Sequence, residues 1–208
     1  MPSLKPLKNI NQLPSIEKVI EISQSLAMLD AILMPDWEYR YFSFNKEWNI
    51  NQYMASMRDG EGSHYYILFD LVNKTSCCLG KIYDNELPNN KEIHSQIKTL
   101  KNFNKFLDEV AFENIDASFY FYYSYETKHW EVVPSTDNIP FLGMMKDKEK
   151  AYISWAEKYY EVKIDRDTVT KIFNFIPLDD NMIANLNPNI TAHEILEDIK
   201  EIGYPYKG

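Results

Sequence analysis

Apolar residues recur with a helical period between residues 16 and 34. The spacing of three and four residues places Ile16, Val19 and Ile20 on one face of a helix. Pro35 ends the pattern, because proline cannot continue a helix. The sequence therefore predicts an amphipathic helix near the N-terminus.

From residue 37 the pattern shortens to a period of two, and aromatic and β-branched residues dominate. The predicted strands are residues 37–44, 53–58, 64–72, 76–83, 118–125 and 129–133. Short polar turns between neighbouring strands are typical of an antiparallel meander, not of βαβ units. Gly80 lies inside a predicted strand, where it predicts a β-bulge.

Helical patterns return after Pro134. The predicted helices are residues 148–160, 167–175, 179–186 and 191–202, with a further short helix at 103–110 after a polar loop at 84–92. Thr191 and Glu194 have the spacing of a capping box, and Gly203 is placed to end the last helix. The predicted fold class is α+β: an antiparallel sheet of about six strands with an N-terminal helix and a C-terminal group of helices.

The same patterns predict the domain organisation. Residues 1–14, punctuated by prolines, form an extended N-terminal arm, and residues 15–208 form a single α+β domain. Within it, residues 36–134 hold the sheet and residues 145–203 the C-terminal helices.

Charge narrows the classes of partner. The 208 residues include 22 Lys and Arg and 31 Asp and Glu, a net charge of −9. Residues 1–100 hold 10 basic and 12 acidic side chains, and residues 101–208 hold 12 and 19, so the second half carries most of the acidity. Such a chain repels phosphate backbones, so we expect no nucleic-acid partner. A basic protein is the better electrostatic match.

The location of the protein follows from what the chain lacks. No stretch reaches 18 uninterrupted apolar residues, so we expect no membrane partner. The N-terminus has two prolines and no apolar core of a secretory signal. Cys77 and Cys78 are adjacent, which suits a reducing compartment. We therefore expect a cytoplasmic protein.

The motifs of common catalytic and cofactor sites are absent. Gly60 and Gly62 lack the third glycine and the helix of a nucleotide-binding loop, so they predict a hairpin turn. The four histidines share no metal-ligand spacing, and two adjacent cysteines on a strand point to opposite faces. We expect no metal and no cofactor. Ser63 and His64, beside Asp59, are the nearest approach to a catalytic set, and a polar hairpin tip is the simpler interpretation.

The chain is rich in aromatic residues. Of 30 aromatic side chains, 15 are tyrosines, and many lie in the predicted strands. Tyrosine buries its ring and keeps its hydroxyl in water, which makes it common at protein interfaces. Both faces of residues 119–125 are aromatic. One of these faces is therefore a binding surface unless helices cover it. That helices do cover it is the simpler expectation.

Three stretches resemble a group of uncharacterised bacterial proteins: Trp37-Glu38-Tyr39-Arg40-Tyr41-Phe42-Ser43-Phe44-Asn45, then Ser56-Met57-Arg58-Asp59-Gly60-Glu61-Gly62, and the ending Ile202-Gly203-Tyr204-Pro205. The resemblance implies a bacterial, cytosolic, single-domain protein and brings no activity with it. In size and charge alone, the chain also resembles acidic immunity proteins that block bacterial toxins.

Two functions from different classes follow. The first is a non-enzymatic protein-binding protein, an immunity protein that neutralises a basic toxin domain. Its expected contact residues are Arg58, Asp59 and Glu61 on the hairpin tip and Tyr122 and Trp130 on the aromatic hairpin.

The second is a hydrolase or transferase with a site at His64, Asp59 and Ser63. A regulatory partner of another protein is a third interpretation, which the sequence does not separate from the first.

Overall fold

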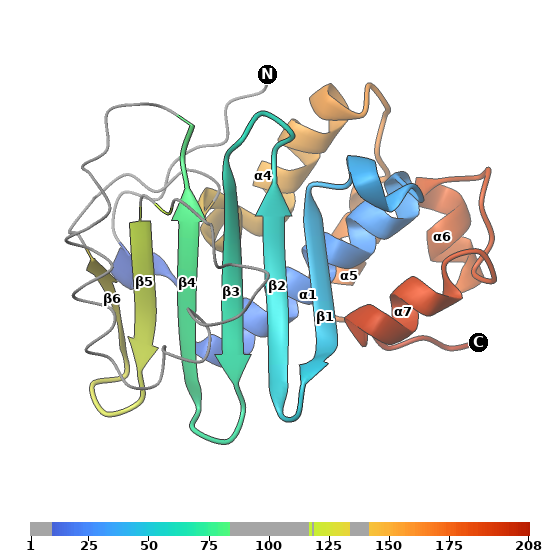
Figure 1. The fold of residues 1–208 in the computed structure, drawn as a ribbon. Helices are drawn as coiled ribbons and strands as arrows, with labels where there is room; N and C mark the ends of the chain where they lie inside the picture. Colours follow the sequence, from blue (N-terminus) through green and yellow to red (C-terminus); the bar gives the residue numbers. More distant parts are fainter. Residues whose placement is uncertain (1–9, 84–116, 118, 134–141) are drawn as a thin grey trace.

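The computed structural model describes residues 10–83, 117, 119–133 and 142–208, and its centre is a six-stranded antiparallel sheet (Figure 1). The strands are β1 (Phe42–Asn49), β2 (Gln52–Arg58), β3 (His64–Asp70), β4 (Thr75–Lys81), β5 (Phe119–Ser124) and β6 (His129–Val133). They pair in sequence order, so the predicted meander is confirmed. β1 and β6 are the two edges of the sheet.

The described helices lie on one face of this sheet and beyond its β1 edge (Figure 1). They are α1 (Ile16–Leu33), α4 (Gly143–Tyr159), α5 (Arg166–Phe173), α6 (Asp180–Leu186) and α7 (Leu196–Ile202), with 3-10 turns η1 (Ile10–Gln12) and η2 (Trp37–Tyr39). An N-terminal helix, a sheet and C-terminal helices confirm the predicted α+β class. The predicted helix at 103–110 lies outside the described residues.

Strand alternation gives the sheet two different faces. The inner face packs on α1 and α4, which in turn contact α5. Its buried residues include Phe42, Phe44, Met57, Tyr65, Ile67, Phe69, Cys78 and Phe121. The outer face carries a smaller buried cluster of Met54, Leu68, Cys77, Leu79, Ala117 and Tyr120. The prediction that Cys77 and Cys78 point to opposite faces is confirmed. Burial raises the pKa of both thiols well above its usual value.

The first strand is shifted from its predicted range: it begins at Phe42 instead of residue 37 and ends at Asn49 instead of residue 44. Residues 37–39 form the turn η2, and pairing with β2 starts at Phe42. The N–H groups of Tyr41 and Phe42 donate to the buried Asp30 of α1, at 3.0 and 2.9 Å. This carboxylate therefore accepts the hydrogen bonds of the two N–H groups at the start of β1, and the preceding residues form a separate turn.

Two smaller predictions are corrected. The pairing of β3 with β4 is regular through Gly80, so no bulge occurs there. A Cβ atom at Gly80 would lie 2.2 Å from the Phe119 ring, so the glycine makes room for that ring. Glu194 does accept a hydrogen bond from the Thr191 N–H, but the helix starts five residues after Thr191, at Leu196.

The described end of the predicted arm is packed. Residues 10–12 form the turn η1, Leu13 is buried, and the carbonyl of Pro14 accepts a hydrogen bond from Trp130. Among the helices that the structure describes, none has both the length and the apolar character needed to cross a bilayer.

Candidate functional site

Four residues lie near the corner of the sheet where α1 leads into β1. We call this set, Trp37, Tyr39, Arg40 and Arg58, the Trp37 corner. Trp37 and Tyr39 are each 57% exposed. The Arg58 guanidinium carbon lies 3.6 Å from the centroid of the Trp37 ring, and Arg58 Nη2 donates to the Trp37 carbonyl at 2.9 Å. An exposed tryptophan fixed by an arginine is the side-chain chemistry of binding hot spots in protein interfaces.

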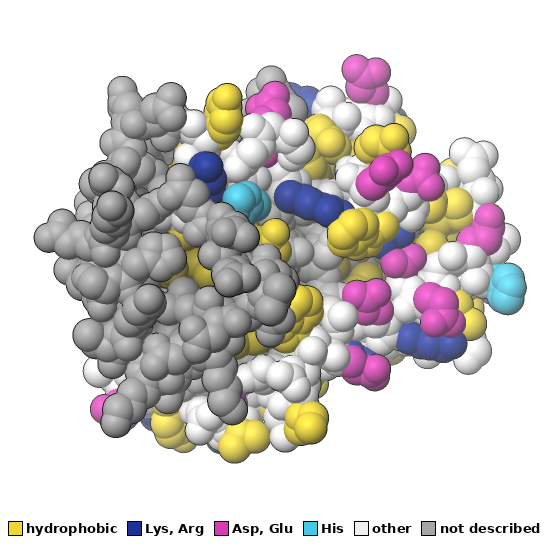
Figure 2. All heavy atoms as spheres, in the orientation of Figure 1, with side chains coloured by type: hydrophobic (Ala, Val, Ile, Leu, Met, Phe, Trp, Pro, Cys, Tyr) yellow, Lys and Arg dark blue, Asp and Glu magenta, His cyan; other side chains and the backbone are white. Residues whose placement is uncertain are grey.

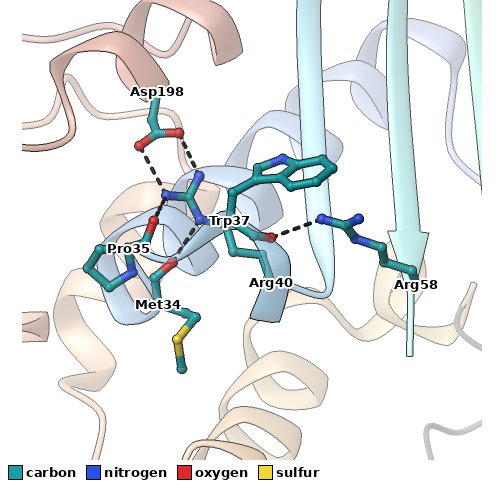
Figure 3. A network of polar contacts seen from close by, with 6 residues as sticks. All are labelled: Met34, Pro35, Trp37, Arg40, Arg58 and Asp198. Carbon is teal, nitrogen blue, oxygen red and sulfur yellow. Dashed lines mark hydrogen bonds and ion pairs between the residues drawn. The ribbon is translucent and has the colours of Figure 1, made fainter. Parts of the chain in front are cut away.

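Arg40 anchors this corner from below (Figure 3). Its side chain is buried, and its Nε donates to the Met34 carbonyl at 2.7 Å while Nη2 donates to the Pro35 carbonyl. Nη1 and Nη2 also bind the two carboxylate oxygens of Asp198 on α7, at 2.6 and 3.0 Å. One guanidinium therefore fixes both the chain turn at η2 and the position of α7.

Carboxylates surround the Trp37 corner. Figure 2 shows acidic side chains gathered over η2 and α7. The exposed ones are Asp36 and Glu38 beside Trp37, Glu61 in the β2–β3 turn, and Glu201, which lines a shallow surface hollow together with Trp37. The negative charge of Glu38 raises the pKa of the Tyr39 hydroxyl. This part of the surface is therefore suited to a positively charged partner.

The structure places Arg58, Asp59 and Glu61 at the end of the β2–β3 hairpin, as the sequence predicts. Gly60 and Gly62 have positive φ, which confirms the predicted turn. The Asp59 carboxylate is buried, and it accepts hydrogen bonds from the N–H groups of Glu61 and, two residues further, Ser63. Asp59 therefore stabilises the turn, whereas Glu61 is exposed.

The catalytic alternative rests on Asp59, Ser63 and His64. Asp59 is engaged by backbone amides, and Ser63 Oγ accepts from the Tyr83 N–H at 3.3 Å. Burial lowers the pKa of His64, and its Nε2 is enclosed without a hydrogen-bond partner in the part of the chain that the structure describes. Within that part, no hydrogen bond joins the three groups into a triad.

Tyr122 and Trp130 lie on opposite faces of the sheet. Tyr122 pairs with Glu131 in the β5–β6 register, so Trp130 is on the other side. The Trp130 ring is buried in the inner-face core, and its Nε1 donates to the Pro14 carbonyl at 2.8 Å. On the outer face, the Tyr122 hydroxyl donates to Glu131, and burial together with this bond raises the pKa of Tyr122 to about 12. The two residues thus do not form one surface.

Trp37, Tyr39 and Arg40 were not among the site residues predicted from the sequence. They lie in the predicted strand 37–44, where alternation assigns the aromatic rings to a packed face. The residue types did point to an interface. Trp, Tyr and Arg follow shortly after Pro35, which ends the helix, and these are the residues that binding hot spots favour.

Among the described residues, no three His, Cys, Asp or Glu side chains are grouped so that they could hold a metal ion. Comparisons with protein-family models, curated proteins and solved structures find no match for the chain.

Proposed function

We propose that this chain is a non-enzymatic protein-binding protein, and specifically a cytoplasmic immunity protein that occludes a basic toxin domain. The observation that carries the proposal is the Trp37 corner. There, a tryptophan that is 57% exposed packs against Arg58, whose guanidinium carbon lies 3.6 Å from the centroid of the ring. An aromatic anchor of fixed orientation gains affinity on binding, because little side-chain freedom remains to be lost. The surrounding carboxylates favour rapid association with a basic partner.

With the Trp37 corner as the binding surface, the proposed contact residues differ from those that the sequence suggested. Arg58 and Glu61 belong to the proposed surface, together with Trp37 and Tyr39. Asp59 contributes by holding the turn that presents Glu61. In the alternative, a hydrolase or transferase at His64, the neighbouring Asp59 carboxylate is bound to backbone amides, so the protein-binding proposal has the stronger support.

The proposal is tested by capture and by growth. The tagged chain is expressed in its source organism, the captured proteins are identified, and the captured protein is then produced in a test host with and without the chain. We expect a basic protein whose toxicity the chain relieves. Trp37→Ala weakens that binding by about 30-fold or more, as expected for the loss of a hot spot.

A matched control lies at the other end of the β1–β2 hairpin. Ile50 is 86% exposed and is separated from Trp37 by the length of β1. Ile50→Ser keeps full capture and growth rescue. Recovery of the chain alone, or equal binding by Trp37→Ala, contradicts the proposal. Unchanged thermal melting of Trp37→Ala shows that any loss is a loss of contact, not of fold.

A further inference from the structure

The three hairpin turns β1–β2, β3–β4 and β5–β6 lie together at one end of the sheet, and the Trp37 corner lies at the other end of β1 (Figure 1). Their residues, 50–51, 71–74 and 125–128, are all exposed, and we call this set the turn end. Figure 2 shows hydrophobic side chains along this lower edge of the molecule. The exposed large hydrophobic residues of the turn end are Ile50, Leu71, Val72 and Tyr125.

Contacts between the turns hold the turn end together. The N–H of Leu71 donates to the carbonyl of Asn51 at 3.0 Å, which joins the β3–β4 turn to the β1–β2 turn. The ammonium group of Lys74 lies 5.7 Å from the centroid of the Tyr125 ring, which joins the same turn to the β5–β6 turn. The apolar side chains are therefore presented on one connected surface, which lowers the cost of ordering them when a partner binds.

The turn end differs in charge from the rest of the chain. It contains Lys74, Lys128 and Glu126, so its net charge is +1, whereas the whole chain carries −9. The Trp37 corner combines two exposed aromatic rings with four exposed carboxylates around them and the single guanidinium of Arg58. The two ends of the sheet thus carry apolar surfaces of opposite charge.

This difference in charge indicates which partner the turn end fits. Two turn ends facing each other bring like charges together, whereas a turn end against a Trp37 corner brings opposite charges together. A lipid surface is the weaker match, because even one myristoyl chain gives only marginal membrane binding. Four partly exposed side chains offer less apolar surface than such a chain. A second copy of this protein is therefore the favoured occupant.

We propose that the turn end of one copy of this chain binds the Trp37 corner of a second copy. Such a head-to-tail contact leaves one surface free on each end copy, so it builds open chains of molecules and not a closed dimer. The contact area is small compared with the roughly 800 Å² per partner of stable complexes, so we expect a dissociation constant on the order of 0.1 mM. The proposal shares the Trp37 corner with the proposed function, so a toxin domain and a second copy exclude each other there.

The experiment is sedimentation velocity on the intact chain from about 10 μM to about 1 mM. About 0.15 M NaCl screens the repulsion between acidic copies beyond about 8 Å. We expect the average sedimentation coefficient to rise with concentration. Val72→Asp alters the turn end at a side chain that is 69% exposed, and Trp37→Ala alters the corner. Each weakens self-association by about tenfold or more.

A matched control adds the same charge elsewhere. Ile176 lies between α5 and α6, outside both surfaces, and its side chain is 42% exposed. Ile176→Asp associates as the wild type does, since general acidity is not what weakens the contact. Unchanged melting temperatures show that the variants are folded.

A mixture of the two weakened variants tests the head-to-tail geometry. Val72→Asp keeps an intact Trp37 corner, and Trp37→Ala keeps an intact turn end. Mixed in equal amounts, they form a dimer with the affinity of the wild-type contact, and this dimer does not lengthen. A dimer of two turn ends behaves differently, because Trp37→Ala alone then associates as strongly as the wild type.

Four results overturn the proposal: no rise with concentration, full association by Trp37→Ala alone, no association in the mixture, or equal weakening by Ile176→Asp. Binding to phosphatidylcholine–phosphatidylglycerol vesicles that Val72→Asp abolishes, by a chain that stays monomeric, overturns it in favour of a lipid surface. The proposed function fails separately. A monomeric chain that captures a toxin removes the self-association alone, and a self-associating chain that captures no toxin removes the proposed function alone.

Discussion

Asp30 is a carboxylate that the fold buries completely, and it joins three elements. From α1 it accepts the N–H groups of Tyr41 and Phe42 at the start of β1 and the hydroxyl of Tyr152 on α4, the last at 2.7 Å. Burial raises the pKa of Asp30 to about 6, although these hydrogen bonds act in the opposite direction. The residue therefore stabilises the fold most when it is protonated.

The sign of the resulting pH dependence follows from linkage. The folded pKa of Asp30 lies above the value of 3.8 for the free side chain. Its contribution to stability is thus complete below about pH 4 and is lost as the pH rises through about 6, a change of about 3 kcal/mol. We expect Asp30→Asn to remove this fall. Urea unfolding between about pH 4 and pH 7 measures the difference between the two proteins.

A second variant checks the cause. Tyr152→Phe removes the hydroxyl that donates to Asp30 and keeps the ring, which is fully buried. Since that bond lowers the pKa of Asp30, its loss raises this pKa further and steepens the fall in stability with pH. A stability difference between wild type and Asp30→Asn that is constant across the range would contradict the argument.

At the scale of elements, the sequence predicted what depends on local pattern and missed what depends on long-range contacts. Period and turn residues were enough to predict all six strands and the N-terminal helix, because a half-buried strand and an amphipathic helix display their burial in the sequence. The start of β1 was missed because it is set by Asp30, a buried group in another element. Gly80 was misinterpreted because its partner, Phe119, lies 39 positions further along the chain.

The candidate site was harder to predict than the fold. Arg58 and Glu61 were identified because the glycine-rich turn predicts a hairpin tip. Trp37 and Tyr39 were assigned to a strand, and their exposure depends on Arg40 holding η2 against Asp198, which is 158 residues away. A contact of that separation leaves no periodic trace in the sequence. The site is therefore visible only once α7 is placed.

The pair of Arg40 and Asp198 is the contact by which α7 holds this corner. Arg40 is 5% exposed, so removing it leaves a partly buried carboxylate and two carbonyls without their donor. We expect Arg40→Met to lower the free energy of unfolding by about 3 kcal/mol. Arg40→Lys restores only part of it, because an ammonium group lacks the bidentate geometry. Chemical denaturation measures both, and hydrogen exchange shows faster opening of α7.

An exposed pair on the same helix provides the control. Lys200 and Glu197 form an ion pair at 2.9 Å with side chains 61% and 89% exposed. Lys200→Met changes the stability by less than about 0.5 kcal/mol, as is usual for exposed pairs. Similar losses for Arg40→Met and Lys200→Met would show that burial of the Arg40 guanidinium adds nothing.

At the scale of the whole molecule, the charge of −9 and the isoelectric point of about 5.0 give a further expectation. Like charges on a compact chain repel one another, so the folded state carries an electrostatic cost that salt screens. At about pH 8, adding about 0.2 M NaCl therefore stabilises the fold on the order of 1 kcal/mol, which raises the melting temperature by about 2–4 °C. Calorimetry at low and moderate salt measures this shift.

The same measurement near the isoelectric point separates net charge from specific pairs. At about pH 5 the net repulsion vanishes, and salt is left to weaken the exposed ion pairs, so the melting temperature stays level or falls slightly. The buried pair of Arg40 and Asp198 is screened little at either pH. A salt effect of equal size at both pH values contradicts the role of net charge. Binding of a basic partner also lowers this repulsion, because it neutralises the carboxylates around the Trp37 corner. The stabilisation of the fold by that partner is therefore largest at low salt.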